Sequence, residues 1–265
     1  MCLILLALGQ RDDLPLVVIA NRDEFYARPT RVAHWWEDHP DTFGGRDLQA
    51  QGTWMGVNKQ GQFAAVTNVR EPDKNPVGKL SRGDLTREFL IGTESAAVFL
   101  HRIESRGEDY AGFNLLLGDS RELWFYSNRQ AGIRKLDPGI YGISNGHFDE
   151  SWPKLSTGKA ALAKALADNV NDAELIDIMC NEQQAADELL PNTGVPLATE
   201  RILSSRFIKS AGYGTRASSL VKFTHHNSIH FSELNYDHET DSKTLIYEEF
   251  SINRDKVYAK QTQSS

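Results

Sequence analysis

Two long apolar runs at the start of the chain constrain its fold more than any other feature. Residues 2–8 and 14–20 are apolar at almost every position, and the polar residues 9–13 between them are typical of a turn. A strand with one solvated face alternates apolar and polar side chains, whereas a strand covered on both faces is apolar throughout. We therefore expect these runs to pair as a hairpin inside a layered structure.

The remaining pattern groups strands apart from helices. A second hairpin is expected at residues 53–57 and 62–68, around the turn 58–61. Periodicity and capping residues predict helices at 85–91, 94–105, 152–167 and 172–180. Further strands are expected at 113–118, 123–127, 139–143, 218–224, 228–234 and 244–250. This order predicts an α+β fold in which one sheet stacks on another and helices lie outside.

Composition and charge limit the classes of function. We expect a single domain over residues 1–265, with a loop at 71–78 and a polar tail at about 254–265. The chain has 29 basic and 36 acidic side chains, and this net charge of −7 argues against nucleic-acid binding. No apolar run approaches the roughly 20 residues of a transmembrane helix, and no basic residue precedes the first run as in a secretory signal. Since Cys2 and Cys180 are the only cysteines, we expect a reduced, cytoplasmic protein.

Cys2 is notable because it directly follows the initiator methionine. A small second residue favours removal of Met1, which would place a thiol and a free α-amine on one residue. An α-amine titrates near pH 8 (about 7.7–8.0), so it could take the thiol proton and leave the nucleophilic thiolate. The alternative is a small apolar residue in a buried strand, where free cysteines are most often found.

Three predicted strands end in polar side chains that could serve such a nucleophile. The run 21–24 (Asn-Arg-Asp-Glu) should lie beside Cys2 if the first hairpin forms, so that Asp23 could hold a substrate amide or orient the Cys2 amine. Asn68 and Asn145 each end a strand after Thr or Ser, and an amide fixed on a strand can donate to an oxyanion. Ordinary turn chemistry is the alternative for each.

Substrate-binding side chains are expected around the same strand ends. Guanidinium groups that converge on one cleft of an acidic protein would select an anionic ligand, such as a carboxylate, phosphate or propionate group. The alternatives are that each arginine pairs with a neighbouring acid, and that the tryptophan fills the core instead of lining a pocket. The predicted binding residues are Asn21, Arg22, Trp54, Arg82 and Arg216.

The joint order of several short motifs resembles the NRDE family, whose eukaryotic members are called transport and Golgi organisation proteins. The pieces span about residues 1–220 of the chain. They are Met1-Cys2-Leu3-Ile4, Asn21-Arg22-Asp23-Glu24-Phe25, Gly44-Gly45-Arg46-Asp47, Gly52-Thr53-Trp54-Met55-Gly56, Thr67-Asn68, Ser81-Arg82-Gly83, Gly112-Phe113-Asn114-Leu115-Leu116, Ser144-Asn145 and Thr215-Arg216. The resemblance implies the four-layer αββα sandwich of N-terminal-nucleophile hydrolases. Among these, the cysteine amidases (choloylglycine and penicillin V acylases) offer the most similar pattern.

The resemblance to these amidases also implies roles for individual residues. Cys2 matches their nucleophile, and Asp23 matches their aspartate at the end of the second strand. Asn68 and Asn145 match two asparagines that serve the oxyanion and the substrate or amine, and Arg216 matches a late arginine.

One position departs from the amidase pattern. Those amidases carry an arginine three residues before the aspartate, where this chain has Ala20. Arg22 lies next to Asp23 in sequence and, by strand alternation, on the opposite face of its strand. Either Arg22 replaces the missing arginine from a different position, or the set of catalytic residues found in those amidases is incomplete here.

Two functions follow as hypotheses, each with a small-molecule ligand and no cofactor. The first is a hydrolase of a C–N amide in which Cys2 forms an acyl thioester that water then cleaves. The second is a non-catalytic carrier of an anionic amphipathic ligand, because the resemblance associates eukaryotic family members with haem and lipid (acyl-CoA) handling. No metal site is expected, since the histidines at 225, 226, 230 and 238 lack the cysteine or paired carboxylates that would complete a ligand set.

Overall fold

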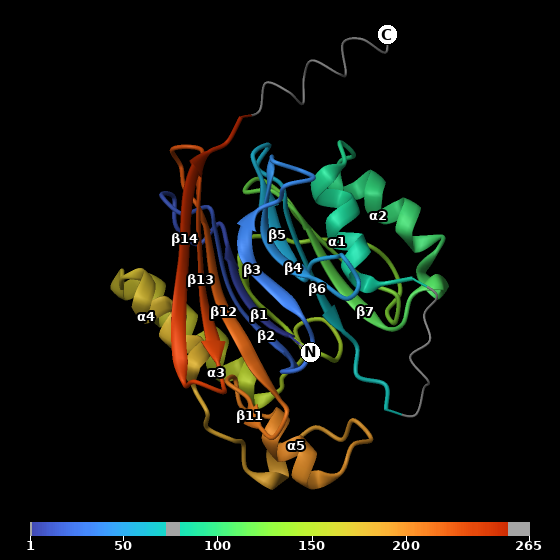
Figure 1. Ribbon diagram of the computed structural model, residues 1–265, viewed down its shortest axis with the longest axis vertical. Helices are drawn as coiled ribbons and strands as arrows, with labels where there is room; N and C mark the ends of the chain where they lie inside the picture. The colour runs from blue at the N-terminus through green and yellow to red at the C-terminus, as the bar shows by residue number, and fades with distance from the viewer. Residues whose placement is uncertain (1, 73–79, 254–265) are drawn as a thin grey trace.

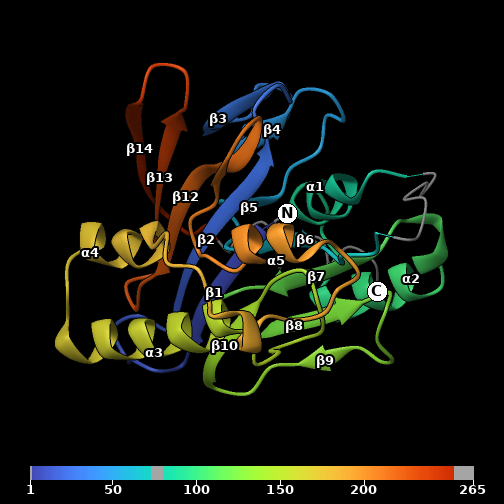
Figure 2. The same ribbon diagram turned by 90° about the horizontal axis from the view of Figure 1, so that it is seen from below.

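The computed structural model describes residues 2–72 and 80–253, so the predicted tail and most of the predicted loop at 71–78 lie outside the described residues. Within the described ranges, two antiparallel sheets stack face to face and helices cover both outer faces (Figures 1 and 2). The predicted αββα sandwich is confirmed. No helix in this part of the chain is long and apolar enough to span a membrane.

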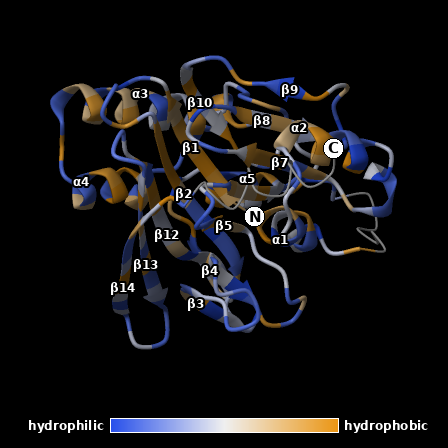
Figure 3. Ribbon diagram, turned by 90° about the horizontal axis from the view of Figure 1, so that it is seen from above, coloured by the Kyte–Doolittle hydropathy of each residue, from blue (hydrophilic) through white to orange (hydrophobic). Residues whose placement is uncertain are grey.

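The first sheet contains the two apolar runs at its centre. Its strand order is β10-β1-β2-β12-β13-β14, with β11 paired on β12. The predicted first hairpin is confirmed, and Figure 3 shows β1 coloured as hydrophobic along its length, as expected for a strand covered on both faces. The strands are β1 (Cys2–Leu8), β2 (Leu16–Phe25), β10 (Gly139–Ile143), β11 (Lys209–Ser210), β12 (Tyr213–Phe223), β13 (Ser228–Asp237) and β14 (Ser242–Ser251).

The second sheet runs in sequence order from β3 to β9. Its predicted members form as expected, but the sequence patterns did not predict β3 and β4. The first is an edge strand with exposed polar positions, and the second contains a glycine pair, so neither has the apolar signature of a strand. The strands are β3 (Thr30–Trp35), β4 (Thr42–Asp47), β5 (Met55–Asn58), β6 (Phe63–Asn68), β7 (Phe113–Gly118), β8 (Leu123–Ser127) and β9 (Arg134–Lys135).

The four predicted helices cover the two sheets. Helices α1 (Arg82–Ile91) and α2 (Ala96–Glu104) pack on the second sheet, and α3 (Pro153–Asp168) and α4 (Asp172–Asp177) pack on the first. The helix predicted at 172–180 is α-helical only to Asp177 and continues as a 3-10 turn. A further helix, α5 (Leu197–Leu203), was not predicted, and it lies near β11 at one end of the molecule (Figure 1).

Strand alternation decides which side chains lie between the sheets. In β1, Leu3 and Leu5 pack under α3 and α4, whereas Ile4 and Leu6 belong to the core between the two sheets. Cys2 therefore shares the inter-sheet face with Ile4. By the same alternation in β2, Ala20 and Arg22 face the second sheet.

Candidate active site

The site forms where the β1–β2 hairpin is open. Cys2 begins β1 and pairs directly with Arg22 near the end of β2, so the expected proximity of these two segments is confirmed. Cys2 is partly buried. Burial raises the pKa of its thiol and the charge of Asp23 raises it further, whereas the charge of Arg22 opposes this rise. At neutral pH the thiol is therefore protonated unless a base acts on it.

Arg22 lies against an aromatic wall supplied by the second sheet. Its guanidinium carbon is 4.3 Å from the centroid of the Trp54 ring, and its side chain is only 5% exposed. The ion pair with Glu24 is long, at 3.9 Å, and Nη1 has no hydrogen-bond partner among the described residues. Trp54 also packs on Gly45, where a Cβ would lie 2.1 Å from the ring. Trp54 thus both packs against the core and lines the site.

Asp23 occupies the opposite face of β2, as alternation predicts. Its carboxylate accepts a hydrogen bond from the Thr215 hydroxyl at 2.7 Å, and the residue is 2% exposed. Burial raises the pKa of Asp23, and the charge of Lys154 on α3 opposes this rise. Lys154 is itself buried and donates to the Leu203 carbonyl at 3.0 Å. Burial lowers the pKa of Lys154 to about 8, against the opposing charge of Asp23.

Asn21 lies beside the site but uses its amide within the protein. It donates to the carbonyls of Met179 and Arg206, both at 2.8 Å, and accepts a hydrogen bond from the Ser218 hydroxyl at 2.6 Å. These bonds hold the segment before α5, at Met179, and the segment after it, at Arg206, against β2 of the first sheet. Both amide hydrogens of Asn21 are therefore used within the protein and are not offered to a substrate.

The two Ser/Thr-Asn strand ends meet at the seam between the sheets. The Asn145 amide donates to the Asn68 carbonyl at 2.9 Å. The Ser144 hydroxyl donates to the Cys2 carbonyl at 3.4 Å. Asn145 is 2% exposed, whereas Asn68 is only partly buried. The structure therefore brings both asparagines to the same end of the sandwich as Cys2.

Of two further predicted arginines, Arg82 lies near Cys2 and Arg216 lies near Arg22. Arg82 begins α1, and its guanidinium donates to a main-chain carbonyl at 3.2 Å. Burial lowers the pKa of Arg82, while the charges of Cys2 and Glu24 oppose this shift. Arg216 occupies a bulge in β12, where its guanidinium donates to main-chain carbonyls of the segment after β2. Burial also lowers the pKa of Arg216, and the charge of Arg22 lowers it further.

Two other arginines, Arg46 within a motif and Arg70 just after another, do not join this group. Arg46 pairs with Asp38 at 2.6 Å, and Arg70 forms a buried ion pair with Glu200 at 2.9 Å. The alternative expectation was that each arginine pairs with an acid next to it in the sequence. Both arginines do pair with acids, but these acids are more distant in the sequence. Arg70 and Glu200 connect the end of β6 to α5.

Three polar residues near the site were not predicted. Lys154 and Tyr213 are coupled electrostatically to both Asp23 and Cys2, and the buried Tyr213 hydroxyl has no hydrogen-bond partner among the described residues. Asn114 donates to the carbonyls of Ser144 and Gly146, at 3.2 and 2.9 Å, and so braces the Asn145 strand end. Asn114 is the one polar residue of an otherwise apolar strand, whereas Lys154 and Tyr213 lie among other polar residues of α3 and β12, and no sequence periodicity marks them.

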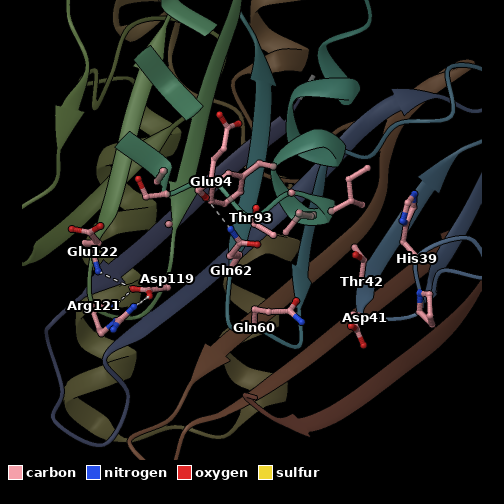
Figure 4. A pocket seen from close by; sticks show the side chains of 18 of the residues that line it. His39, Asp41, Thr42, Gln60, Gln62, Thr93, Glu94, Asp119, Arg121 and Glu122 are labelled. Atoms are coloured by element: carbon pink, nitrogen blue, oxygen red, sulfur yellow. Dashed lines mark hydrogen bonds and ion pairs between the residues drawn. The ribbon is translucent and has the colours of Figure 1, made fainter. Parts of the chain in front are cut away.

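A large cavity lies away from Cys2. It has a volume of about 790 Å³ and is formed by the start of β6, the end of α1 and the β7–β8 turn (Figure 4). Gln60 and Gln62 line it at one end of β6, whereas Asn68 ends the same strand. No predicted site residue lines this cavity. Among the residues described, no group of three His, Cys, Asp or Glu side chains could hold a metal ion.

Known proteins share both the sequence pattern and the fold. The family described as Transport and Golgi organisation 2 matches residues 1–238. The Transport and Golgi organization protein 2 homologs of Homo sapiens and Bos taurus are 30% and 31% identical to this chain, over 82% of it and 85% of each relative. The Caenorhabditis elegans N-acylethanolamine-hydrolyzing acid amidase ortholog, at 9% identity, superimposes with a TM-score of 0.51 over 83% of this chain and 92% of its own. This likeness shows a shared N-terminal-nucleophile hydrolase fold, and the sequence match shows that the chain belongs to the Transport and Golgi organisation 2 family.

Proposed function

We propose that the protein is a cysteine amidohydrolase that cleaves a C–N amide bond whose amine portion carries an anionic group. The observation that carries this proposal is the meeting of Cys2, Asp23 and Asn145 at one end of the sandwich, with the unpartnered Nη1 of Arg22 beside them. A fold alone does not imply an activity, so the proposal depends on these side chains.

The proposed reaction begins with the amine that removal of Met1 would expose on Cys2. This amine takes the thiol proton, and the thiolate attacks the amide carbonyl. Asn145 has one amide hydrogen bonded to Asn68, and its second hydrogen donates to the oxyanion together with the Asn68 amide. The Cys2 ammonium then protonates the leaving amine, and water hydrolyses the acyl thioester to regenerate the thiol. Asp23 orients the ammonium throughout.

The anionic character of the substrate is supported by a local reversal of charge. The protein has a net charge of −7, yet Arg22 and Arg82 lie near Cys2, and Arg216 lies near Arg22. Glu24 lies 3.9 Å from Arg22. Glu71 faces Arg82 and Asp47 faces Arg216, but these two acids pair with Arg129 and Arg28. Guanidinium groups with unused donors bind carboxylate or phosphate well, particularly where burial excludes water.

The second candidate is a carrier that binds an anionic amphipathic ligand, such as haem or acyl-CoA, without cleaving it. Ala20 favours this reading because the arginine of related amidases is missing there. The same three arginines would then hold the anionic group of the ligand. Titration with haem and with acyl-CoA, using wild type and Arg216→Ala, tests this candidate, and the absence of saturable binding would remove it.

A reducing compartment such as the cytoplasm belongs to the proposal. The nucleophile must remain a thiol to react, and Cys2 and Cys180 are both free cysteines. Recovery of unmodified Cys2 from cells, by mass spectrometry after rapid alkylation, is the expected result.

Intact mass and amide turnover together test the hydrolase. The purified protein should lack Met1, which exposes the Cys2 amine. On a panel of N-acyl amino acids, Cys2→Ala should lower turnover by roughly 10³-fold or more while the melting temperature stays close to that of wild type. Cys180→Ala is the matched control and should keep wild-type turnover. Retention of Met1, or equal turnover in Cys2→Ala and wild type, would contradict the proposal.

A further inference from the structure

The space beside Cys2 is small. Cys2 lines a cavity of about 10 Å³ between the two sheets, which is room for one water-sized group. Ile4 and Ala20 line it from the first sheet, and Met55 and Val66 line it from the second. All four of these residues are at most 6% exposed.

Trp54 forms the wall of this cavity that is hardest to move. The Arg22 guanidinium lies 4.3 Å from one face of its ring, and Gly45 packs closely on the ring from β4. A side chain at Gly45 would collide with the ring, so only glycine leaves the space that Trp54 fills. A ring with both of these contacts cannot turn away to enlarge the cavity without losing them.

The proposed chemistry decides which part of a substrate enters this cavity. The leaving nitrogen takes its proton from the Cys2 amine, so it must lie on the side of the Cys2 main-chain nitrogen, at the open end of the hairpin. Arg82 and Arg216 lie around that open end. The acyl substituent points the other way from the carbonyl carbon, into the space between the sheets.

We propose that this cavity is the acyl pocket, and that Trp54 restricts the acyl group to a short one such as formyl or acetyl. The inference rests on the proposed function and adds the substrate class: a short-chain N-acyl amide with an anionic amine portion. A long acyl chain would have to displace Trp54 or Met55 from a close-packed interior. Misfit of this kind is a strong basis for discrimination by size, because each methylene changes the rate by roughly 10-fold or more.

A series of p-nitrophenyl esters tests the inference without knowledge of the natural amine. Acetyl, butyryl and octanoyl esters are mixed with the protein, and acylation of Cys2 is followed by intact mass and by release of p-nitrophenolate. In wild type, the acylation rate should fall by roughly 100-fold or more from acetyl to octanoyl. In Trp54→Ala the fall should shrink to less than about 10-fold, because the cavity opens.

Two further variants keep the test decisive. Met55→Ala enlarges the same cavity from another side, so it serves if Trp54→Ala does not fold. Trp124→Ala removes a tryptophan that packs with the helix-covered core of the second sheet, and it should keep the wild-type preference. Equal acylation of wild type by acetyl and octanoyl esters would overturn this inference and leave the proposed function standing. Failure of every ester to acylate Cys2 would overturn both.

Discussion

Buried charge is the main feature of the site at the scale of single residues. Asp23 and Lys154 lie under the first sheet, where burial raises the pKa of the acid and lowers that of the base. Each charge partly compensates the desolvation of the other. The pair keeps the Asp23 carboxylate charged beside Cys2 in a part of the protein that excludes water. A buried carboxylate of this kind is suited to orient the Cys2 ammonium group.

The depressed pKa of Lys154 predicts how stability depends on pH. Its pKa is about 8 in the folded protein and 10.5 as a free side chain, so the unfolded state binds more protons between these values. The free energy of unfolding should therefore rise as pH increases through this window, by at most about 3 kcal/mol from this group. Lys154→Met should lack that rise.

Urea unfolding of wild type and Lys154→Met across the window measures the difference. Lys164→Met is the matched control, because Lys164 lies on the same helix and its side chain is 77% exposed. This control should keep the wild-type rise. The same slope in wild type and Lys154→Met would show that folding does not lower the pKa of Lys154.

At the scale of elements, the apolar character of a segment decided whether it could be predicted. The β1–β2 hairpin follows from two uninterrupted apolar runs, since burial on both faces leaves that signature. Strand β3 is exposed along an edge, and α5 has one buried polar residue, Glu200, in place of an apolar stripe. Their positions depend on contacts between distant segments. The same reason kept Lys154 out of the predicted site. Cys2 was marked by its position after Met1, and hairpin geometry predicted that the segment of Asp23 lies beside it.

The buried pair between Arg70 and Glu200 should fasten α5 to the sandwich. Both side chains are at most 7% exposed, and removal of one partner leaves the other buried without its counter-charge. Arg70→Met should therefore cost about 3–5 kcal/mol, either in global stability or as local opening of the segment that contains α5. Hydrogen exchange and limited proteolysis distinguish these two results.

Arg201 provides a control on the same helix. It pairs with Asp187, but both side chains are more than 40% exposed, so Arg201→Met should change stability by less than about 1 kcal/mol. The double variant Arg70→Met with Glu200→Gln should recover part of the loss, because no charge is then left buried. An equal effect of Arg70→Met and Arg201→Met would show that α5 is held by other contacts.

At the scale of the whole molecule, the charge near Cys2 opposes the net charge of −7. The protein as a whole repels anions, whereas the arginines at the open end of the hairpin should attract them within a short range. Such a local field concentrates an anionic substrate at the thiol and leaves the rest of the surface unattractive to it. The effect can be measured without a substrate, because two alkylating reagents of similar size differ in charge.

Iodoacetate is an anion and iodoacetamide is neutral, and both react with the thiolate. The ratio of their rates at one cysteine therefore reports the local potential and is independent of the pKa of that thiol. We expect this ratio to be roughly 10-fold higher at Cys2 than at Cys180, which faces Tyr236 and serves as the internal control. Arg82→Met should lower the ratio at Cys2 alone.

Salt provides a second test of the same local potential. At about 1 M salt the screening length falls to about 3 Å, so the rate ratios at the two cysteines should become more alike. Equal ratios at both cysteines in low salt would show that the arginines are neutralised and that the site does not select anions.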